Sequence, residues 1–75
     1  MPKLPVLKDQ DLLRVLHKLG FFEHRRRGTS HLILKHTDGR RTVIALHPGH
    51  DIPRGTLRGI LRDIDITPDQ LREIL

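Results

Sequence analysis

The dipeptide Asp38-Gly39 constrains the fold of this 75-residue chain more than any other feature. It separates two segments rich in apolar residues, 31–36 and 41–47, and this dipeptide favours the tight turn of a β-hairpin. We therefore expect the two segments to pair as antiparallel strands.

The length of that turn would decide which side chains share a face of the hairpin. A two-residue loop places Leu34 opposite Val43 on one apolar face. Leu32 then lies opposite Ala45 on the same face. His31 points to the other side, away from any helix that covers the apolar face.

A helix and a further strand are predicted ahead of the hairpin. Leucines and a valine recur at helical spacing over residues 9–19, and Gly20 stands where a left-handed C-terminal cap belongs. Phe21, just beyond the cap, can pack back on the helix. A strand is expected over 22–27.

Two helices are predicted after the hairpin. The first should begin near Ile52 or Pro53. The second begins after Thr67, which forms a capping box with Gln70. The fold class is therefore α+β, a single domain over 1–75, in which helices cover one face of a three-stranded antiparallel sheet.

Composition limits the possible partners. A net charge of +5, from 14 Lys and Arg against 9 Asp and Glu, indicates a polyanion, although a merely solvated basic surface has the same charge. The chain has no cysteine, no signal-like N-terminus and no apolar run that could span a bilayer, so we expect a soluble cytoplasmic protein. Phe21 and Phe22 are its only aromatic residues, too few for the stacking platforms of single-strand RNA readers.

A candidate RNA-cleaving segment precedes the second strand. Arg25, Arg26 and Arg27 can grip phosphate, and His31 can move protons near neutral pH. RNA supplies its own nucleophile, the 2′-hydroxyl, so one proton-transferring group and a few cations suffice. The same residues are also compatible with a basic strand that faces solvent and has no role in RNA cleavage.

The group that would complete proton transfer is left open among His24, His36 and His47, with an arginine or water as alternatives. Zinc at His47, His50 and Asp51 is considered and set aside, because no further ligands are evident. The acids are scattered rather than clustered as a magnesium site requires. We therefore expect no metal and no cofactor.

An arginine stripe marks the predicted second helix. Arg54, Arg58 and Arg62 recur every fourth residue and can contact RNA, an acidic partner or only solvent. Gly55 and Gly59 lie between them. Each costs roughly 1 kcal/mol relative to alanine in a helix, which close approach of another backbone would explain.

Over nearly its whole length the chain resembles the HicA toxins of bacterial toxin–antitoxin pairs. The residues that carry the resemblance are Lys18-Leu19-Gly20-Phe21, Ser30-His31, Thr37-Asp38-Gly39-Arg40 and the segment 55–62. The resemblance implies a fold similar to a double-stranded-RNA-binding domain, mRNA cleavage without the ribosome, and a complex with a HicB-like antitoxin. It assigns the catalytic histidine of a Gly-Ser-His motif to His31. Here Thr29 replaces the motif's glycine.

Two other functions fit the same residues. The first is a non-catalytic RNA-binding module, for which replacing His31 would leave binding largely intact. The second is a structural or regulatory protein whose basic helix docks on an acidic partner. It would bind RNA no better than any equally basic protein.

Overall fold

The computed structural model describes residues 4–28 and 30–75. The elements follow in the order α1 (Asp9–Lys18), β1 (Phe22–Arg27), β2 (His31–Lys35), β3 (Arg41–Ala45), α2 (Arg54–Ile64) and α3 (Pro68–Ile74). The strands form one antiparallel sheet in the order β1-β2-β3. The predicted α+β class, with an open three-stranded sheet, is confirmed. Thr29 lies outside the described residues.

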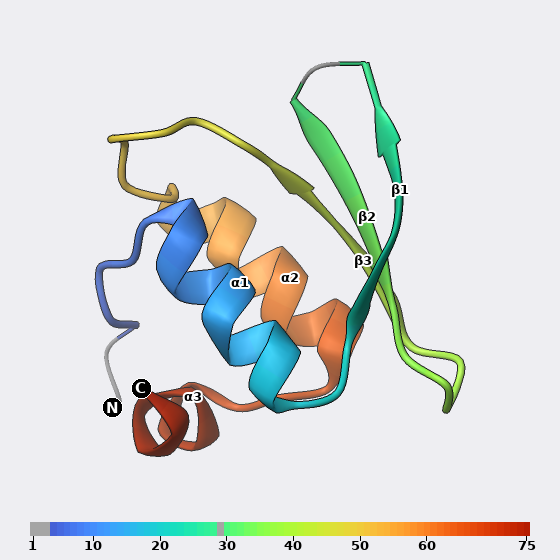
Figure 1. Cartoon of the computed structure of the whole chain (residues 1–75). Helices are drawn as coiled ribbons and strands as arrows, with labels where there is room; N and C mark the ends of the chain where they lie inside the picture. Colours follow the sequence, from blue (N-terminus) through green and yellow to red (C-terminus); the bar gives the residue numbers. More distant parts are fainter. Residues whose placement is uncertain (1–3, 29) are drawn as a thin grey trace.

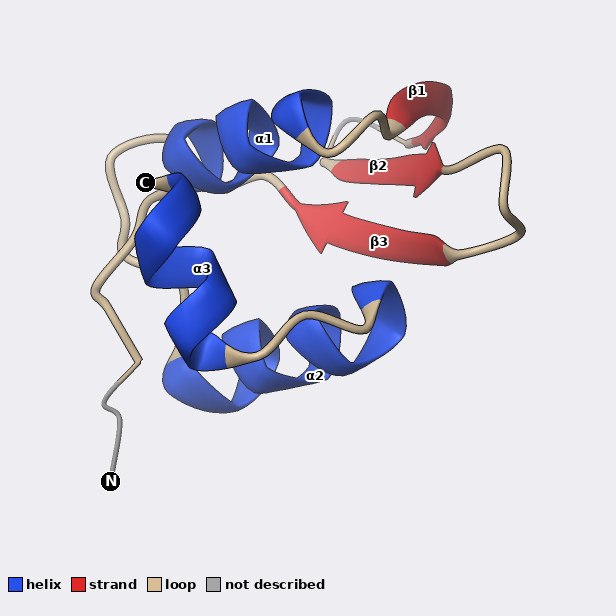
Figure 2. Ribbon diagram, turned by 90° about the horizontal axis from the view of Figure 1, so that it is seen from below, coloured by secondary structure: helices blue, strands red, loops and turns tan. Residues whose placement is uncertain are grey.

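The three helices lie on the same side of the sheet (Figures 1 and 2). Helices α1 and α2 face the sheet, and α3 lies at the end where the N-terminal segment also runs. The core between these layers is aliphatic apart from one phenylalanine. Its fully buried side chains include Leu12, Leu16, Leu34, Ile44, Leu57, Ile64 and Leu71. No helix among the described residues is long and apolar enough to cross a membrane.

Helix α1 ends as its sequence predicts. Gly20 has a φ of +96°, and its N–H donates to the carbonyl of His17 at 3.1 Å. The Phe21 N–H donates to the carbonyl of Leu16 at 2.9 Å. This pair of bonds is the Schellman ending. It turns the chain so that Phe21 enters the core with 3% of its surface exposed.

The predicted capping box of α3 is also confirmed. Thr67 Oγ1 accepts from the Gln70 N–H at 3.1 Å, and Gln70 Oε1 accepts from the Thr67 N–H at 2.8 Å. Two of the unpaired N–H groups at the helix start are thereby satisfied.

The predicted register of the hairpin is wrong by one residue. Leu34 pairs with Thr42 and Leu32 with Ile44, rather than with Val43 and Ala45. The cause is a three-residue loop. The Gly39 N–H donates to the His36 carbonyl at 3.0 Å, and Gly39 takes a φ of +99°, as in a type I turn closed by a glycine bulge.

Because side chains alternate along a strand, this shift exchanges the two faces of β3. Thr42 and Ile44 are buried under the helices, whereas Val43 is 37% exposed on the other side. The Thr42 hydroxyl donates to Asp63 of α2 at 3.0 Å, so the polar group in this layer is paired. The prediction that His31 and Ile33 lie opposite the helix-covered face still holds, because Leu32 and Leu34 keep that face.

The hairpin loop also forms hydrogen bonds to the C-terminal ends of both long helices. His36 Nε2 lies 3.1 Å from the carbonyl of Leu19, which can only accept, so Nε2 carries the proton. On the other side of the loop, Arg40 Nη1 donates to the carbonyl of Ile64 at the end of α2. Phe21 lies between the two, edge-on to the His36 ring and beneath the Arg40 guanidinium.

Asp38 holds this loop in shape. It accepts from the backbone N–H of Arg40 at 3.0 Å and from its Nε at 2.7 Å, while its own N–H donates to His36 Nδ1. The hydrogen bond from the Arg40 backbone, followed by the contacts with the guanidinium, lowers the pKa of Asp38 below its ordinary value.

Candidate functional site

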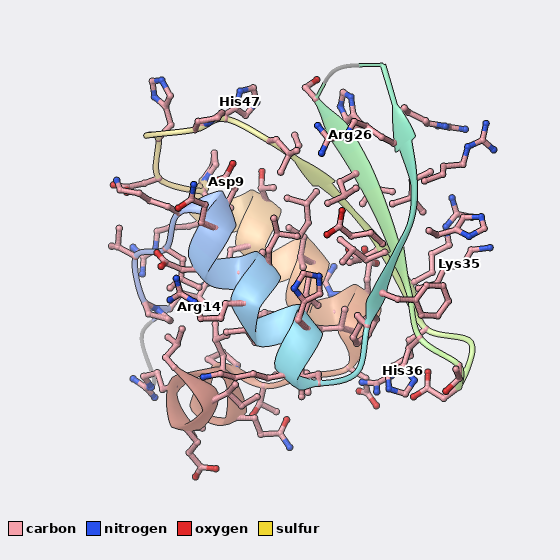
Figure 3. The ribbon with its side chains drawn as sticks, in the orientation of Figure 1. Asp9, Arg14, Arg26, Lys35, His36 and His47 are labelled. Atoms are coloured by element: carbon pink, nitrogen blue, oxygen red, sulfur yellow. The ribbon has the colours of Figure 1, made fainter. Side chains whose placement is uncertain are left out.

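The face of the sheet away from the helices carries the candidate site. We call it the open face and define it by the side chains that the strand pairing places there: Phe22, Arg25, Arg27, His31, Ile33, Lys35, Arg41, Val43 and Ala45. Four of these residues are cations and none is an acid. Figure 3 shows Lys35 on the side of the sheet away from the helices. Any ligand that covers this face meets positive charge around a small apolar centre.

His31 begins β2 at one end of the open face. Its side chain is exposed, and its cross-strand partners are Arg27 on β1 and Ala45 on β3. Ser30 Oγ lies 3.4 Å from His31 Nδ1, a long contact, and among the described residues Nε2 has no hydrogen-bond partner. A hydroxyl can donate to a bare ring nitrogen or accept from a protonated one. Ser30 can therefore hold the ring in either protonation state.

A β-bulge in β1 decides which arginines accompany His31. Glu23 pairs with Leu34 and Arg25 pairs with Ile33, so His24 is an extra residue between them. Such a bulge re-aims the side chains that follow it. Without the extra residue, counting from Phe22 would put Arg26 on the open face in place of its two neighbours.

The three predicted phosphate-binding arginines are thus divided between the faces. Arg27 and Arg25 are exposed on the open face, opposite His31 and Ile33. Arg26 lies opposite Leu32, on the side of the helices, and Figure 3 shows it across the sheet from Lys35. The structure brings two of the three together with His31.

Two further cations of the open face were not among the predicted site residues, although Lys35 was expected on the same face as His31. Lys35 and Arg41 form a cross-strand pair at the far end of the open face from His31. Lys35 lies four residues after His31 on the same predicted strand, so the alternation of side chains places both on one face. Arg41 could not be assigned a face without the correct loop length.

His36 and His24, two candidates for a second proton-transferring group, do not share His31's surroundings. His36 belongs to the hairpin loop at the opposite end of β2, where it contacts Leu19 and Phe21. His24 occupies the bulge of the edge strand and is exposed.

His47, the third candidate, lies beyond the end of β3 in a loop that it shares with the rejected zinc ligands. The face predicted for it rested on the wrong register. Figure 3 shows His47 at the opposite end of the molecule from His36. Within residues 4–28 and 30–75, no three His, Asp or Glu side chains are close enough to hold a metal ion. Asp51 is instead paired with Lys8 at 3.2 Å.

The arginine stripe lies apart from His31. Arg54, Arg58 and Arg62 are exposed on α2, which covers the other face of the sheet. In the part of the chain that the structure describes, none of the three forms an ion pair. A Cβ at Gly55 or Gly59 would meet no atom within 4 Å, so no described segment of this chain packs closely there.

Comparison with protein families places this chain in a known family. The model of a family described as the HicA toxin of bacterial toxin-antitoxin matches residues 10–66, more than half of the chain. The match includes all of α1 except Asp9, the whole sheet and α2. A comparison with curated proteins gives no match.

Proposed function

Since this chain belongs to the HicA family of bacterial toxins, we propose that it is an endoribonuclease that cleaves mRNA without the ribosome and without a metal ion. The observation that carries the proposal is the pairing of His31 with Arg27 on a face that holds four cations and no acid. A proton-transferring group and a phosphate ligand thereby face the same space.

In the proposed reaction the 2′-oxygen of the RNA bonds to the neighbouring phosphorus. The bond from phosphorus to the 5′-oxygen breaks, which leaves a 2′,3′-cyclic phosphate and a free 5′-hydroxyl. His31 Nε2 either accepts the proton of the 2′-hydroxyl or donates a proton to the leaving 5′-oxygen, and water completes the other transfer, while Ser30 holds Nδ1. Arg27 and Arg25 stabilise the charge that builds on the phosphate oxygens. Arg26 contributes only to the general positive potential.

The antitoxin of this toxin is proposed to be HicB-like and to form a hetero-oligomer with it in the cytoplasm. It would inhibit by covering the open face. That face offers Phe22, 45% exposed, and Val43, 37% exposed, which are large apolar side chains for a protein to bury. The cations around them favour an acidic antitoxin surface.

The test is cleavage of a long single-stranded RNA by the purified protein, with and without EDTA. We expect cleavage that survives EDTA, is lost in His31→Ala and is retained in His24→Ala, a matched change of an exposed histidine on the same sheet. Circular dichroism and thermal melting establish that both variants are folded. Loss of wild-type activity in EDTA would contradict the metal-independent reaction.

The alternative is a non-catalytic RNA-binding module with a fold like that of double-stranded-RNA-binding domains. The basic open face supports this reading as well, since phosphate binding needs no histidine. It would replace the proposal if neither protein cuts RNA and if His31→Ala and the wild type bind RNA equally.

A further inference from the structure

The end of the open face opposite His31 carries a second group of positive charges. Lys35 and Arg41 lie there as a direct cross-strand pair. The His36 N–H donates to the Arg40 carbonyl at 2.9 Å, so the adjacent pair, Lys35 with Arg41, is one without mutual hydrogen bonds. Side chains approach most closely in such a pair, and like charges directly opposite each other destabilise a sheet. An anion between the two cations would offset this cost.

No acid of the described chain neutralises this pair. The open face carries no acidic side chain, and within residues 4–28 and 30–75 neither Lys35 nor Arg41 forms an ion pair. Arg41 is exposed and Lys35 is half-buried. Both charges can therefore be reached from solution. A phosphate group suits them, because its oxygens accept several charge-assisted hydrogen bonds at once.

An exposed aromatic ring lies next to these cations. Phe22 of β1 is the direct cross-strand partner of Lys35, so the two side chains share the open face. Phe22 is 45% exposed, whereas the other phenylalanine, Phe21, is buried in the core. Any nucleobase can stack on such a ring, because every base has a π-face. A phosphate site beside a single stacking ring matches the two parts of one nucleotide.

The distance from His31 to this cluster fits a single RNA strand. His31 and Lys35 are four residues apart on β2, which corresponds to about 13 Å in an extended strand. A helical nucleic-acid strand rises about 3.4 Å per nucleotide and a strand with splayed bases about twice as much, so about two nucleotide steps join the two ends. Arg25 lies between the ends, opposite Ile33, and adds a cation along the path.

We propose that Phe22, Lys35 and Arg41 form a subsite for a second nucleotide of the same RNA strand, two nucleotides away from the phosphate that is cut. This deepens the proposed RNA cleavage and rests on it. Lys35 and Arg41 bind the phosphate of that nucleotide, and Phe22 stacks on its base. The RNA must be single-stranded at this position, because a base stacked inside a double helix cannot offer its face to the ring. Stacking is tolerant of sequence, so the subsite selects single-stranded RNA rather than a particular base.

The first test measures stacking without cleavage, in His31→Ala protein. Fluorescence anisotropy gives the affinity for a short labelled single-stranded RNA and for copies in which one base at a time is replaced by an abasic site. We expect one such replacement to weaken binding by about fivefold or more. The same replacement should have little effect on Phe22→Leu, which keeps apolar bulk without the ring, and its full effect on Phe22→Tyr, which keeps the ring.

Two outcomes of this test would overturn the subsite. The first is that no abasic site weakens binding to the parent protein. The second is that Phe22→Leu responds to every abasic site as the parent does. If Phe22→Leu weakens only the complex with the antitoxin, the ring belongs to that interface and the subsite is likewise overturned. Circular dichroism establishes that the variants are folded.

The second test measures kcat/KM for di-, tri- and tetranucleotides with His31 intact. Wild type should gain about fivefold or more when the substrate is long enough to reach the subsite, and Phe22→Leu and Arg41→Gln should lose most of this gain. Arg14→Gln, which removes an exposed arginine of α1, is the control for net charge. A gain that is absent, or unchanged in both variants, overturns the subsite alone. If wild type cuts no RNA of any length, the proposed function fails, and the abasic-site titration still decides whether RNA occupies the subsite.

Discussion

Arg27 is the direct cross-strand partner of His31, and both side chains are exposed on the open face. Its neighbour Arg26 points to the side of the helices. The two arginines have the same charge and adjacent positions, so they form a matched pair for testing whether phosphate is bound on the open face.

We expect Arg27→Ala to weaken RNA binding and to reduce the salt slope, the dependence of log K on log salt concentration, by about 0.7, the value of one phosphate contact on a single strand. Arg26→Ala should change the slope much less. The measurement is fluorescence anisotropy of a labelled RNA at several salt concentrations, in the His31→Ala background to prevent cleavage. If the two variants lose RNA affinity and salt slope equally, RNA binding depends only on net charge and not on the open face.

Ser30 is expected to act as a positioning residue for His31. Removing its hydroxyl in Ser30→Ala takes away the Nδ1 contact, and kcat should fall several-fold, in keeping with the loss of one hydrogen bond worth about 1 kcal/mol. KM should stay the same, because Ser30 is not a phosphate ligand. Restored kcat in Ser30→Thr would support positioning. If Ser30→Ala instead loses activity only because part of the protein is unfolded at the assay temperature, as thermal melting would show, the role of Ser30 is purely structural.

Arg40 and Arg41 are adjacent arginines, of which only Arg40 is expected to contribute to stability. Arg40 contacts Phe21, Asp38 and the end of α2, whereas Arg41 is exposed on the open face. Arg40→Met should lower the free energy of unfolding by about 2 kcal/mol, because it removes charged hydrogen bonds and a cation at a helix C-terminus. Arg41→Met should be close to neutral. Urea unfolding measures both, and equal effects would contradict the role of the loop.

The lowered pKa of Asp38 predicts a pH dependence of stability. The carboxylate is favoured in the folded state, so its contribution is fully present above the pKa of Asp in the unfolded chain, about 3.9. It is lost as the pH falls through the lower folded pKa. The stability difference between wild type and Asp38→Asn, measured by urea unfolding between about pH 2 and pH 7, should therefore vanish at the acid end. A difference independent of pH would refute this.

The exposed arginines of α2 offer a contact that is separate from RNA cleavage. If the antitoxin contacts α2 in addition to the open face, Arg58→Glu should weaken its binding by tenfold or more while leaving RNA cleavage within about twofold, because α2 lies on the other side of the sheet from His31. Arg14→Glu on α1 makes the same change in charge and is the control. Titration calorimetry with the purified antitoxin and an RNA cleavage assay measure the two effects.

The elements that sequence reasoning predicted correctly have local signals. Gly20 supplies a backbone conformation that other residues avoid, and Thr67 with Gln70 supplies a reciprocal pair of hydrogen bonds. Each acts within one turn of chain, so its outcome does not depend on distant contacts.

The arrangement of the candidate site depended on two positions with ambiguous signals. Asp38-Gly39 fits both a two-residue and a three-residue loop, and in the longer one Arg40 reaches the carbonyl of Ile64 at the end of α2, a contact that only the folded chain contains. The bulge at His24 contains no glycine that would indicate it in the sequence.

The hairpin loop that fastens α1 and α2 lies at the end of β2 opposite His31. The contacts that stabilise the fold and the proposed catalytic histidine therefore lie at opposite ends of one short strand. Loss-of-function changes at the His31 end need not unfold the chain. An inactivated copy would remain folded and, by occupying antitoxin, would release active copies from inhibition.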